Sequence, residues 1–317
     1  MYQLNSFKNQ CYYVKQIAFA FILIVIFDSS FAQNKISINR KKLFDTDWKF
    51  FLGDTVSAKL KDFDDKNWRN LDLPHDWSIE GKIEHKNPTG IAGGFFPTGI
   101  GWYRKTFKVS SDLKGKNISV YFEGVYMNSE VFINGKSLGV YPYGYSSFSY
   151  NLSTYLDYGK ENVIAVRVDN SQQVNCRWYS GSGIYRHVWM VTTDPVHIAQ
   201  WGVGISTPEV TQKTATVLIK TLVKNETAVP QSIALKSQLW DANSKNAGIN
   251  QIKVELPANS EKETTQTIDV SNPSIWTNET PNIYQAQVQV IKEKQVIDDT
   301  KTPFGIRSIK FTAENGF

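Results

Sequence analysis

The sequence predicts an all-β protein that consists of two β-sandwiches. Short runs of apolar residues alternate with polar ones along most of the chain, and Gly, Asn, Asp and Ser separate the runs. No long stretch shows the 3.6-residue period of an amphipathic helix, and only residues 56–62 and 153–158 have room for a helical turn or two. The 317 residues are also too many for one ordinary hydrophobic core, which favours two domains.

Composition and charge narrow the class of protein further. Charged residues make up 21% and hydrophobic residues 41% of the chain, as in a folded globular protein rather than a disordered one. The formal charge of +5 is spread thinly with no Lys/Arg block, which argues against a nucleic-acid partner. Aromatic residues reach 13%, a content that suits large sandwich cores or sugar-binding surfaces.

Residues 1–32 have the pattern of a secretory signal peptide. Two lysines precede the apolar run 17–27, and Ser30 and Ala32 are the small residues expected just before a cleavage site. An uncleaved membrane anchor is the alternative, but the run is shorter than the ~18–20 residues of a spanning helix. Cleavage leaves Cys176 as the one cysteine, so an intrachain disulfide is excluded. We therefore expect export to a bacterial periplasm or the extracellular medium.

The first predicted domain covers residues 33–194. Its dense aromatics, long loops and many short strands favour a jelly-roll-like double sheet. Asn134-Gly135 is the strongest hairpin signal, because both residues tolerate the positive φ of a tight turn. The predicted strands are 101–109, one with Ile118, Val120 and Phe122 on its apolar side, 131–133 and 138–141 around that turn, 163–168 and 187–192.

The second predicted domain covers residues 195–311. The composition changes near Asp194-Pro195, after which strands are longer and more polar and come at regular intervals. Such spacing without paired cysteines predicts an immunoglobulin-like sandwich of the disulfide-free kind. The runs that predict its strands are 215–224, 233–240, 252–256 and 283–290.

The segment 177–186 between two predicted strands is the first candidate for function. It combines two arginines, three aromatic residues and two glycines. Aromatic faces accept the C–H groups of a sugar, and a guanidinium donates to its hydroxyls. The structural alternative is a loop at the end of a sheet whose aromatic rings cap the core.

The same segment resembles the loop in the N-terminal sugar-binding domain of family 2 glycoside hydrolases, and further motifs match this family in the same order. The resemblance implies a jelly-roll, galactose-binding-like domain and an immunoglobulin-like domain, followed by a (β/α)8 barrel that carries two catalytic glutamates. That barrel is absent from this chain, and residues 312–317 match the start of its connector. The matching motifs are Leu73-Pro74-His75-Asp76-Trp77-Ser78, Gly93-Gly94-Phe95-Phe96-Pro97, Gly101-Trp102-Tyr103-Arg104-Lys105, Phe132-Ile133-Asn134-Gly135 and Phe304-Gly305-Ile306-Arg307.

The resemblance implies the non-catalytic N-terminal portion of a retaining glycoside hydrolase. The versions of these motifs in this sequence look most like those of β-galactosidases, which hydrolyse terminal β-galactosides in carbohydrate catabolism. Another specificity of the family, β-glucuronidase or β-mannosidase, and a stand-alone carbohydrate-binding module or lectin are the alternatives, with a structural surface domain as a third class. The implied partners are a carbohydrate and the missing barrel; a homo-oligomer stays open, and no cofactor is expected.

The resemblance places Arg177 where one loop residue reaches the sugar in the active site. Well-known members have an acidic residue there, so Arg177 is a departure. A guanidinium cannot accept hydroxyl protons, but it can donate a charge-assisted bond to a sugar oxygen or to a carboxylate of the barrel. A salt bridge at a domain interface is the alternative. Trp178 and Tyr179 either shape the sugar pocket or pack against the barrel.

His75 and Asp76 are the remaining substrate-binding candidates. Neighbouring residues on an extended chain point to opposite faces, so this pair is a poor acid/base couple, and no catalytic residue is predicted. Asp76 either hydrogen-bonds backbone in a turn or binds a substrate hydroxyl. The histidines and carboxylates nearby lack metal-ligand spacing, so no metal is predicted. The glycine-rich stretch 87–101 lacks the Lys-Ser/Thr pair of a phosphate loop and is expected to form a mobile rim.

Overall fold

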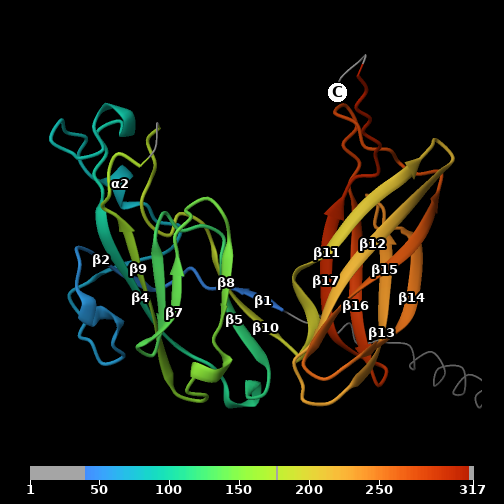
Figure 1. Ribbon diagram of the computed structural model, residues 1–317, viewed down its shortest axis with the longest axis horizontal. Coiled ribbons are helices and arrows are strands. Elements are labelled where there is room, and N and C mark those ends of the chain that lie inside the picture. Colours follow the sequence, from blue (N-terminus) through green and yellow to red (C-terminus); the bar gives the residue numbers. More distant parts are fainter. Residues whose placement is uncertain (1–39, 176–177, 314–317) are drawn as a thin grey trace, which may run out of the picture. The chain divides into compact units, whose positions relative to one another are not determined.

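The computed structural model describes residues 40–175 and 178–313, and the predicted all-β fold is confirmed (Figure 1). The predicted signal peptide, Cys176, Arg177 and residues 314–317 lie outside the described residues. Every pair of strands within a sheet is antiparallel.

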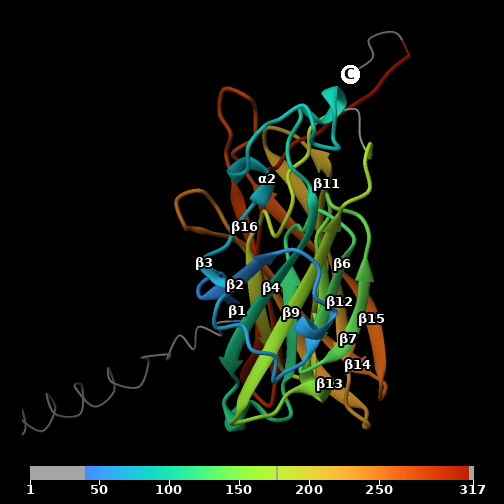
Figure 2. The ribbon, with the colours of Figure 1, turned by 90° about the vertical axis from the view of Figure 1, so that its left-hand side faces the viewer.

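The first sandwich has a six-stranded and a four-stranded sheet. In Figure 2, β4 and β9 run side by side along the larger sheet, as their ten-residue register requires. That sheet has the order β3 (Arg69–Leu71), β2 (Trp48–Leu52), β4 (Gly99–Lys108), β9 (Glu161–Asn170), β6 (Ser129–Ile133), β7 (Lys136–Tyr141), and the smaller one has the order β1 (Lys41–Leu43), β10 (Val188–Thr193), β5 (Asn117–Phe122), β8 (Phe148–Asn151).

One hydrophobic core lies between these two sheets. The apolar side predicted for β5 is confirmed, since Ile118, Val120 and Phe122 are at most 1% exposed. They pack in the same cluster as Tyr103 of β4 and Val166 of β9. The two-residue hairpin is confirmed as well, because Asn134 and Gly135 have φ of 48° and 83° between β6 and β7.

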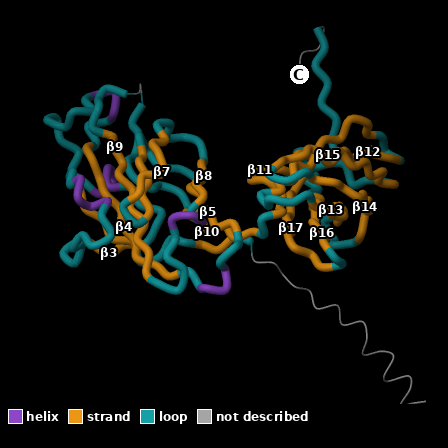
Figure 3. Tube along the Cα trace, turned by 60° about the horizontal axis from the view of Figure 1, so that its bottom comes forward, coloured by secondary structure: helices purple, strands orange, loops and turns teal. Residues whose placement is uncertain are grey.

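Within residues 40–175 and 178–313, helical structure is confined to single turns of the first sandwich, drawn in purple in Figure 3. The turns expected within residues 56–62 and 153–158 are present as η1 (Val56–Lys59) and η4 (Ser153–Tyr155). The sequence did not predict α2 (Trp77–Glu80), η2 (Ile91–Gly93) or η3 (Ser111–Leu113). Within the described residues, no helix is long and apolar enough to cross a membrane.

The second sandwich has a three-stranded and a four-stranded sheet, the arrangement of an immunoglobulin-like fold. Buried residues alternate with more accessible ones along β12 and β13 and supply much of its core, with Ile219 and Leu235 at 0% exposure. The strands are β11 (Val196–Val210), β12 (Thr214–Asn225) and β15 (Ser260–Ser271) in one sheet, and β14 (Asn246–Leu256), β13 (Gln231–Trp240), β16 (Tyr284–Lys292) and β17 (Gln295–Phe304) in the other.

The predicted domain boundary falls in the short link between β10 and β11. β10 ends at Thr193 and β11 begins at Val196. The buried apolar residues before and after this link form different clusters. That residues 33–194 and 195–311 fold as separate domains stays a prediction.

Candidate functional site

Two segments that lie more than a hundred residues apart in the sequence are joined beside the candidate loop. The backbone N–H of His75 donates to the carbonyl of Ile184 at 2.9 Å, and that of Trp77 donates to the carbonyl of Ser182 at 3.1 Å. The segment that contains His75 and Asp76 therefore lies along the end of the loop that carries Trp178 and Tyr179. The structure brings these four predicted site residues into one region.

Asp76 holds this junction together. Its Oδ1 accepts hydrogen bonds from the backbone N–H of Ser78 at 2.9 Å and of Ser182 at 2.8 Å. The first bond caps α2, and the second fastens the loop. Its Oδ2 lies so close to Gly181 that a Cβ at that position would overlap it. Asp76 thus has a clear local role in the fold, and its contact with a substrate hydroxyl stays a prediction.

His75 is buried, and both of its ring nitrogens have partners. Nδ1 lies 2.7 Å from the hydroxyl of Tyr103, and Nε2 lies 3.2 Å from Oε2 of Glu80. Burial lowers the pKa of His75, so the ring is neutral near pH 7. The hydrogen bonds from Arg69 lower the pKa of Glu80 to about 2, so its carboxylate is ionised and only accepts.

These charge states fix the direction of a buried hydrogen-bond chain. Nε2 of His75 lies nearer to the accepting Glu80 than to Nη2 of Arg69, at 3.2 against 3.4 Å, so we place the proton on Nε2 and Nδ1 accepts from Tyr103. Burial raises the pKa of Tyr103 well above its usual value, which keeps its hydroxyl protonated. In this arrangement both nitrogens of the His75 ring bond to protein groups. A contact between His75 and a sugar stays a prediction.

Trp178 and Tyr179 face solvent, unlike His75. They are 67% and 53% exposed, and their rings stack with centroids 5.3 Å apart at an interplanar angle of 30°. Phe96 joins them, since its ring centroid lies 5.7 Å from that of Tyr179. Sequence reasoning did not select Phe96 as a site residue, although its motif of two glycines before two phenylalanines was the available signal. The three rings form an aromatic surface of the kind that binds the apolar faces of sugars.

Buried amide and hydroxyl groups brace the loop beneath that surface. Asn170, only 2% exposed at the end of β9, donates through Nδ2 to Oγ of Ser182 at 2.7 Å. Its Oδ1 accepts from Nδ2 of Asn175 at 2.7 Å and from Nε2 of Gln173 at 3.0 Å. The hydroxyl of Ser78 donates to Ser182 at 2.7 Å. Both flanks of the loop are thus tied to one buried side chain, which no sequence pattern had singled out.

The described residues contain no cluster of three or more His, Cys, Asp or Glu side chains that would hold a metal ion. Arg177, the sharpest candidate from the sequence, lies outside the described residues. The aromatic surface and the braced loop are therefore the features that the structure assigns to this site.

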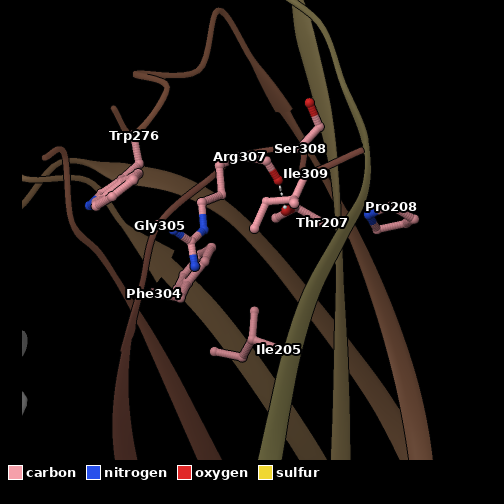
Figure 4. A pocket seen from close by; sticks show the side chains of 9 residues that line it. All are labelled: Ile205, Thr207, Pro208, Trp276, Phe304, Gly305, Arg307, Ser308 and Ile309. Atoms are coloured by element: carbon pink, nitrogen blue, oxygen red, sulfur yellow. Dashed lines mark hydrogen bonds between the residues drawn. The ribbon is translucent and has the colours of Figure 1, made fainter. Parts of the chain in front are cut away.

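The motif Phe304-Gly305-Ile306-Arg307 lies at a second pocket, of about 630 Å³, in the second sandwich (Figure 4). The Arg307 guanidinium covers the Trp276 ring at 4.7 Å from its centroid. The backbone N–H of Trp276 donates to the carbonyl of Ile306 at 2.9 Å, and the hydroxyl of Thr207 donates to the carbonyl of Arg307 at 2.7 Å. Because the cation occupies a face of the indole, this pocket is a weaker sugar platform than the Trp178–Tyr179 pair.

Two family models match the chain in succession. The model described as "Glycosyl hydrolases family 2, sugar binding domain" matches residues 42–195, and the model "Glycosyl hydrolases family 2" matches residues 196–307. Their spans coincide with the two sandwiches.

The chain is similar to proteins described as glycosidases and to a solved structure of family 2. The β-galactosidase BoGH2A of Bacteroides ovatus is 45% identical over 282 residues, which are 89% of this chain and 33% of that protein. A putative β-glucuronidase of Formosa agariphila is 38% identical over 274 residues, 86% of this chain and 26% of that protein. A crystal structure of a family 2 member from Bacteroides cellulosilyticus matches with a TM-score of 0.85 and 37% identity, over 87% of this chain and 36% of that one.

The chain thus spans between about a quarter and about a third of the length of these relatives. The matches run through both sandwiches, and the family resemblance of the sequence motifs is confirmed. This chain belongs to the glycosyl hydrolases of family 2.

Proposed function

We propose that this chain is the non-catalytic front part of a retaining β-galactosidase. The observation that carries the proposal is the solvent-facing pair Trp178–Tyr179 on a loop that Asp76 and Asn170 fasten from below. The similarity to the β-galactosidase BoGH2A, at 45% identity, supports galactosides as the substrate class. The pair shapes one wall of the sugar site, and Arg177 donates to a sugar oxygen or to a catalytic carboxylate.

The chemistry of hydrolysis is proposed to lie outside this chain. Glycoside hydrolysis needs two carboxyl groups, and in a retaining enzyme they stand about 5–5.5 Å apart on either side of the scissile bond. We assign them to the (β/α)8 barrel that the family resemblance implies. The first sandwich then contributes positioning, in which stacking and hydrogen bonds to the bound sugar orient it for attack.

A β-glucuronidase is the second candidate, because the Formosa agariphila relative at 38% identity is described as one. A third candidate, from another class, is a stand-alone carbohydrate-binding module. It is supported by an aromatic pair that is accessible in this chain by itself.

Chromogenic substrates distinguish these candidates. The purified 317-residue chain and a form extended to the length of its relatives are each incubated with a β-galactoside and a β-glucuronide. We expect no turnover by the chain beyond that of a mock purification, and turnover of the galactoside by the extended form. Preferential cleavage of the glucuronide would select the second candidate, and sugar binding with no activity in either form would select the third.

We also propose that the protein is exported and that residues 1–32 are removed. The lysines, the apolar run and the small residues before Gln33 support this. Mass spectrometry of protein recovered from the periplasm of an expressing bacterium is expected to find Gln33 at the N-terminus. Intact Met1 in a membrane fraction would replace export with anchoring.

A further inference from the structure

The first sandwich carries another pocket, of about 640 Å³, that the proposed function does not use. The end of β5 and the segment just before β10 form part of it, and these two strands are neighbours in the smaller sheet (Figure 1). None of the four predicted substrate-binding residues that the structure describes lines it. The residues that carry the argument are Tyr121, Glu123, Tyr145, Tyr185, Arg186 and His187.

A buried carboxylate orients His187 at the rim of this pocket. Nδ1 of His187 lies 2.6 Å from Oδ2 of Asp45, which is 4% exposed. The other oxygen of Asp45 accepts from the backbone N–H of Val188 at 2.8 Å. An ionised carboxylate only accepts, so Nδ1 carries the proton and Nε2 of the half-exposed ring is left for a ligand.

Glu123 is held in a similar way. Its Oε1 accepts from Nε1 of Trp189 at 2.8 Å, and the ammonium of Lys41 lies 3.5 Å from the same oxygen. Lys41 itself lies over the Trp189 ring, 4.0 Å from its centroid. The carboxylate is thus positioned through one oxygen, and the pocket has an acceptor in Glu123 as well as the donors of Arg186.

Tyrosine rings supply flat apolar walls. The hydroxyl of Tyr185 donates to the carbonyl of Gly144 at 2.7 Å, which fixes that ring. Gly124 lies against the same ring, and a Cβ at this position would lie only 2.7 Å from the Tyr185 ring. Tyr145, 57% exposed, packs edge-on against Tyr126 with ring centroids 5.1 Å apart. The walls are therefore fixed by the protein before any ligand arrives.

Fixed aromatic walls with both donors and acceptors match an uncharged, polyhydroxylated ring. A sugar hydroxyl donates to Glu123 and accepts from Arg186, while the ring C–H groups stack on tyrosine. Glu123 and Arg186 carry opposite charges, so the residues that line the pocket do not favour an ionic ligand by charge alone, and an apolar ligand would leave these polar groups unpaired. We propose that this pocket binds a neutral pyranosyl unit of a glycan, at a site separate from the aromatic surface of Trp178 and Tyr179.

The proposal does not depend on β-galactosidase activity, because it needs no catalytic group. Ligand-observed NMR by saturation transfer on the 317-residue chain tests it, with lactose and cellobiose as neutral probes and galacturonic acid as the charged one at matched ionic strength. We expect saturation transfer to at least one neutral disaccharide, and weaker transfer to galacturonic acid.

Variants then locate the binding. Arg186→Gln and Tyr145→Ala are expected to weaken affinity about tenfold or more, since each removes a contact with the ligand. Tyr155→Ala is the control, because Tyr155 of η4 is exposed and does not line this pocket, and it should leave the affinity unchanged. Tyr179→Ala reports any binding at the other aromatic surface. Thermal melts show whether each variant is folded, and Tyr145→Ala changes a side chain that is mostly in solvent.

The remaining outcomes overturn the proposal. These are no saturation transfer to either neutral sugar, preference for galacturonic acid, or loss of binding in Tyr179→Ala with Arg186→Gln and Tyr145→Ala unaffected. The last result would move the sugar to the loop site and so support the proposed function while removing this pocket.

Discussion

The two sandwiches place their buried polar groups differently. In the first, Ser78, Asn170 and Ser182 are buried at the loop end and bond to one another across segments far apart in sequence. In the second, Ser237 donates to Gln266 at 2.7 Å inside the sandwich, and both are at most 1% exposed. The bonds in the first sandwich hold irregular segments together, whereas the bond in the second joins two regular strands, β13 and β15.

This difference indicates a division of labour. A polar network under a loop holds exposed rings such as Trp178 in place, and such preorganisation favours binding. Regular strands with alternating burial supply stability without presenting a surface. We therefore expect substitutions of the buried polar groups at the loop end of the first sandwich to affect fold and function together, those of the exposed loop residues to affect function, and those in the second sandwich to affect stability alone.

Gly183→Val is expected to have the largest effect on folding. Gly183 has φ of 125°, where a β-branched residue is strained, and a Cβ there would overlap the Tyr103 hydroxyl and lie 2.7 Å from the His75 carbonyl. We expect a loss of ~3 kcal/mol or more in the free energy of unfolding. Gly204→Val, on β11, is the control, because the nearest atom to its Cβ is 4.0 Å away. Similar denaturation midpoints for the two variants would contradict this explanation.

A pair of buried groups in the second sandwich predicts opposite pH dependences. Burial lowers the pKa of His197 to about 4, and burial raises that of Asp298 to about 6. The stability from His197 is present above its unfolded value near 6.5 and is lost as pH falls through 4. The stability from Asp298 is present below its unfolded value near 3.8 and is lost as pH rises through 6.

Single variants separate these two effects between pH 4 and 6.5. Relative to the wild type, Asp298→Asn should gain stability as pH rises through this window, and His197→Gln should lose it. Each change is expected to be about 2 kcal/mol, since one pKa unit corresponds to ~1.4 kcal/mol. Urea titrations at several pH values measure both. If the two variants shift in the same direction, the assigned burial effects are wrong.

Asp76→Ala sharpens the comparison at the loop end of the first sandwich. The change removes both the cap of α2 and the acceptor for the Ser182 N–H, so we expect a loss of about 2 kcal/mol. Asp76→Asn retains an oxygen and should lose less than half as much. Hydrogen exchange at the Ser182 amide is the local readout. If the Ser182 amide is as protected in Asp76→Ala as in the wild type, its bond to Asp76 does not hold the loop in place.

The sequence predicted regular strands well and polar ones poorly. Strands with apolar alternation, such as β5 and β12, were found. β15, with the polar run Ser260–Thr267, and β17, which buries the charged Asp298, were not. Their burial depends on partners elsewhere in the fold, which a local pattern does not contain.

The candidate site could also be predicted only in part, because some of its contacts join residues far apart in the sequence. The aromatic residues of the loop were recognised from their composition and from the family motif. The bond between Asp76 and Ser182 joins residues 106 positions apart, and the partners of His75 include Tyr103 of β4. Local sequence contains no signal for such pairings. From the sequence alone, Asp76 could therefore have either a structural or a binding role, and the structure shows the backbone contacts of the structural role.

The central claim is that the loop at the end of the first sandwich serves sugar binding more than folding. The most direct test compares Arg177→Ala and Trp178→Ala in two measurements: thermal melts of the 317-residue chain, and kcat/KM for a chromogenic β-galactoside in the extended form. We predict nearly unchanged melting temperatures and a ten- to hundredfold lower kcat/KM, equivalent to about 1.5–3 kcal/mol of lost contact. Unchanged kcat/KM, or melting temperatures that fall far below the wild type, would contradict the claim and give the loop a structural role.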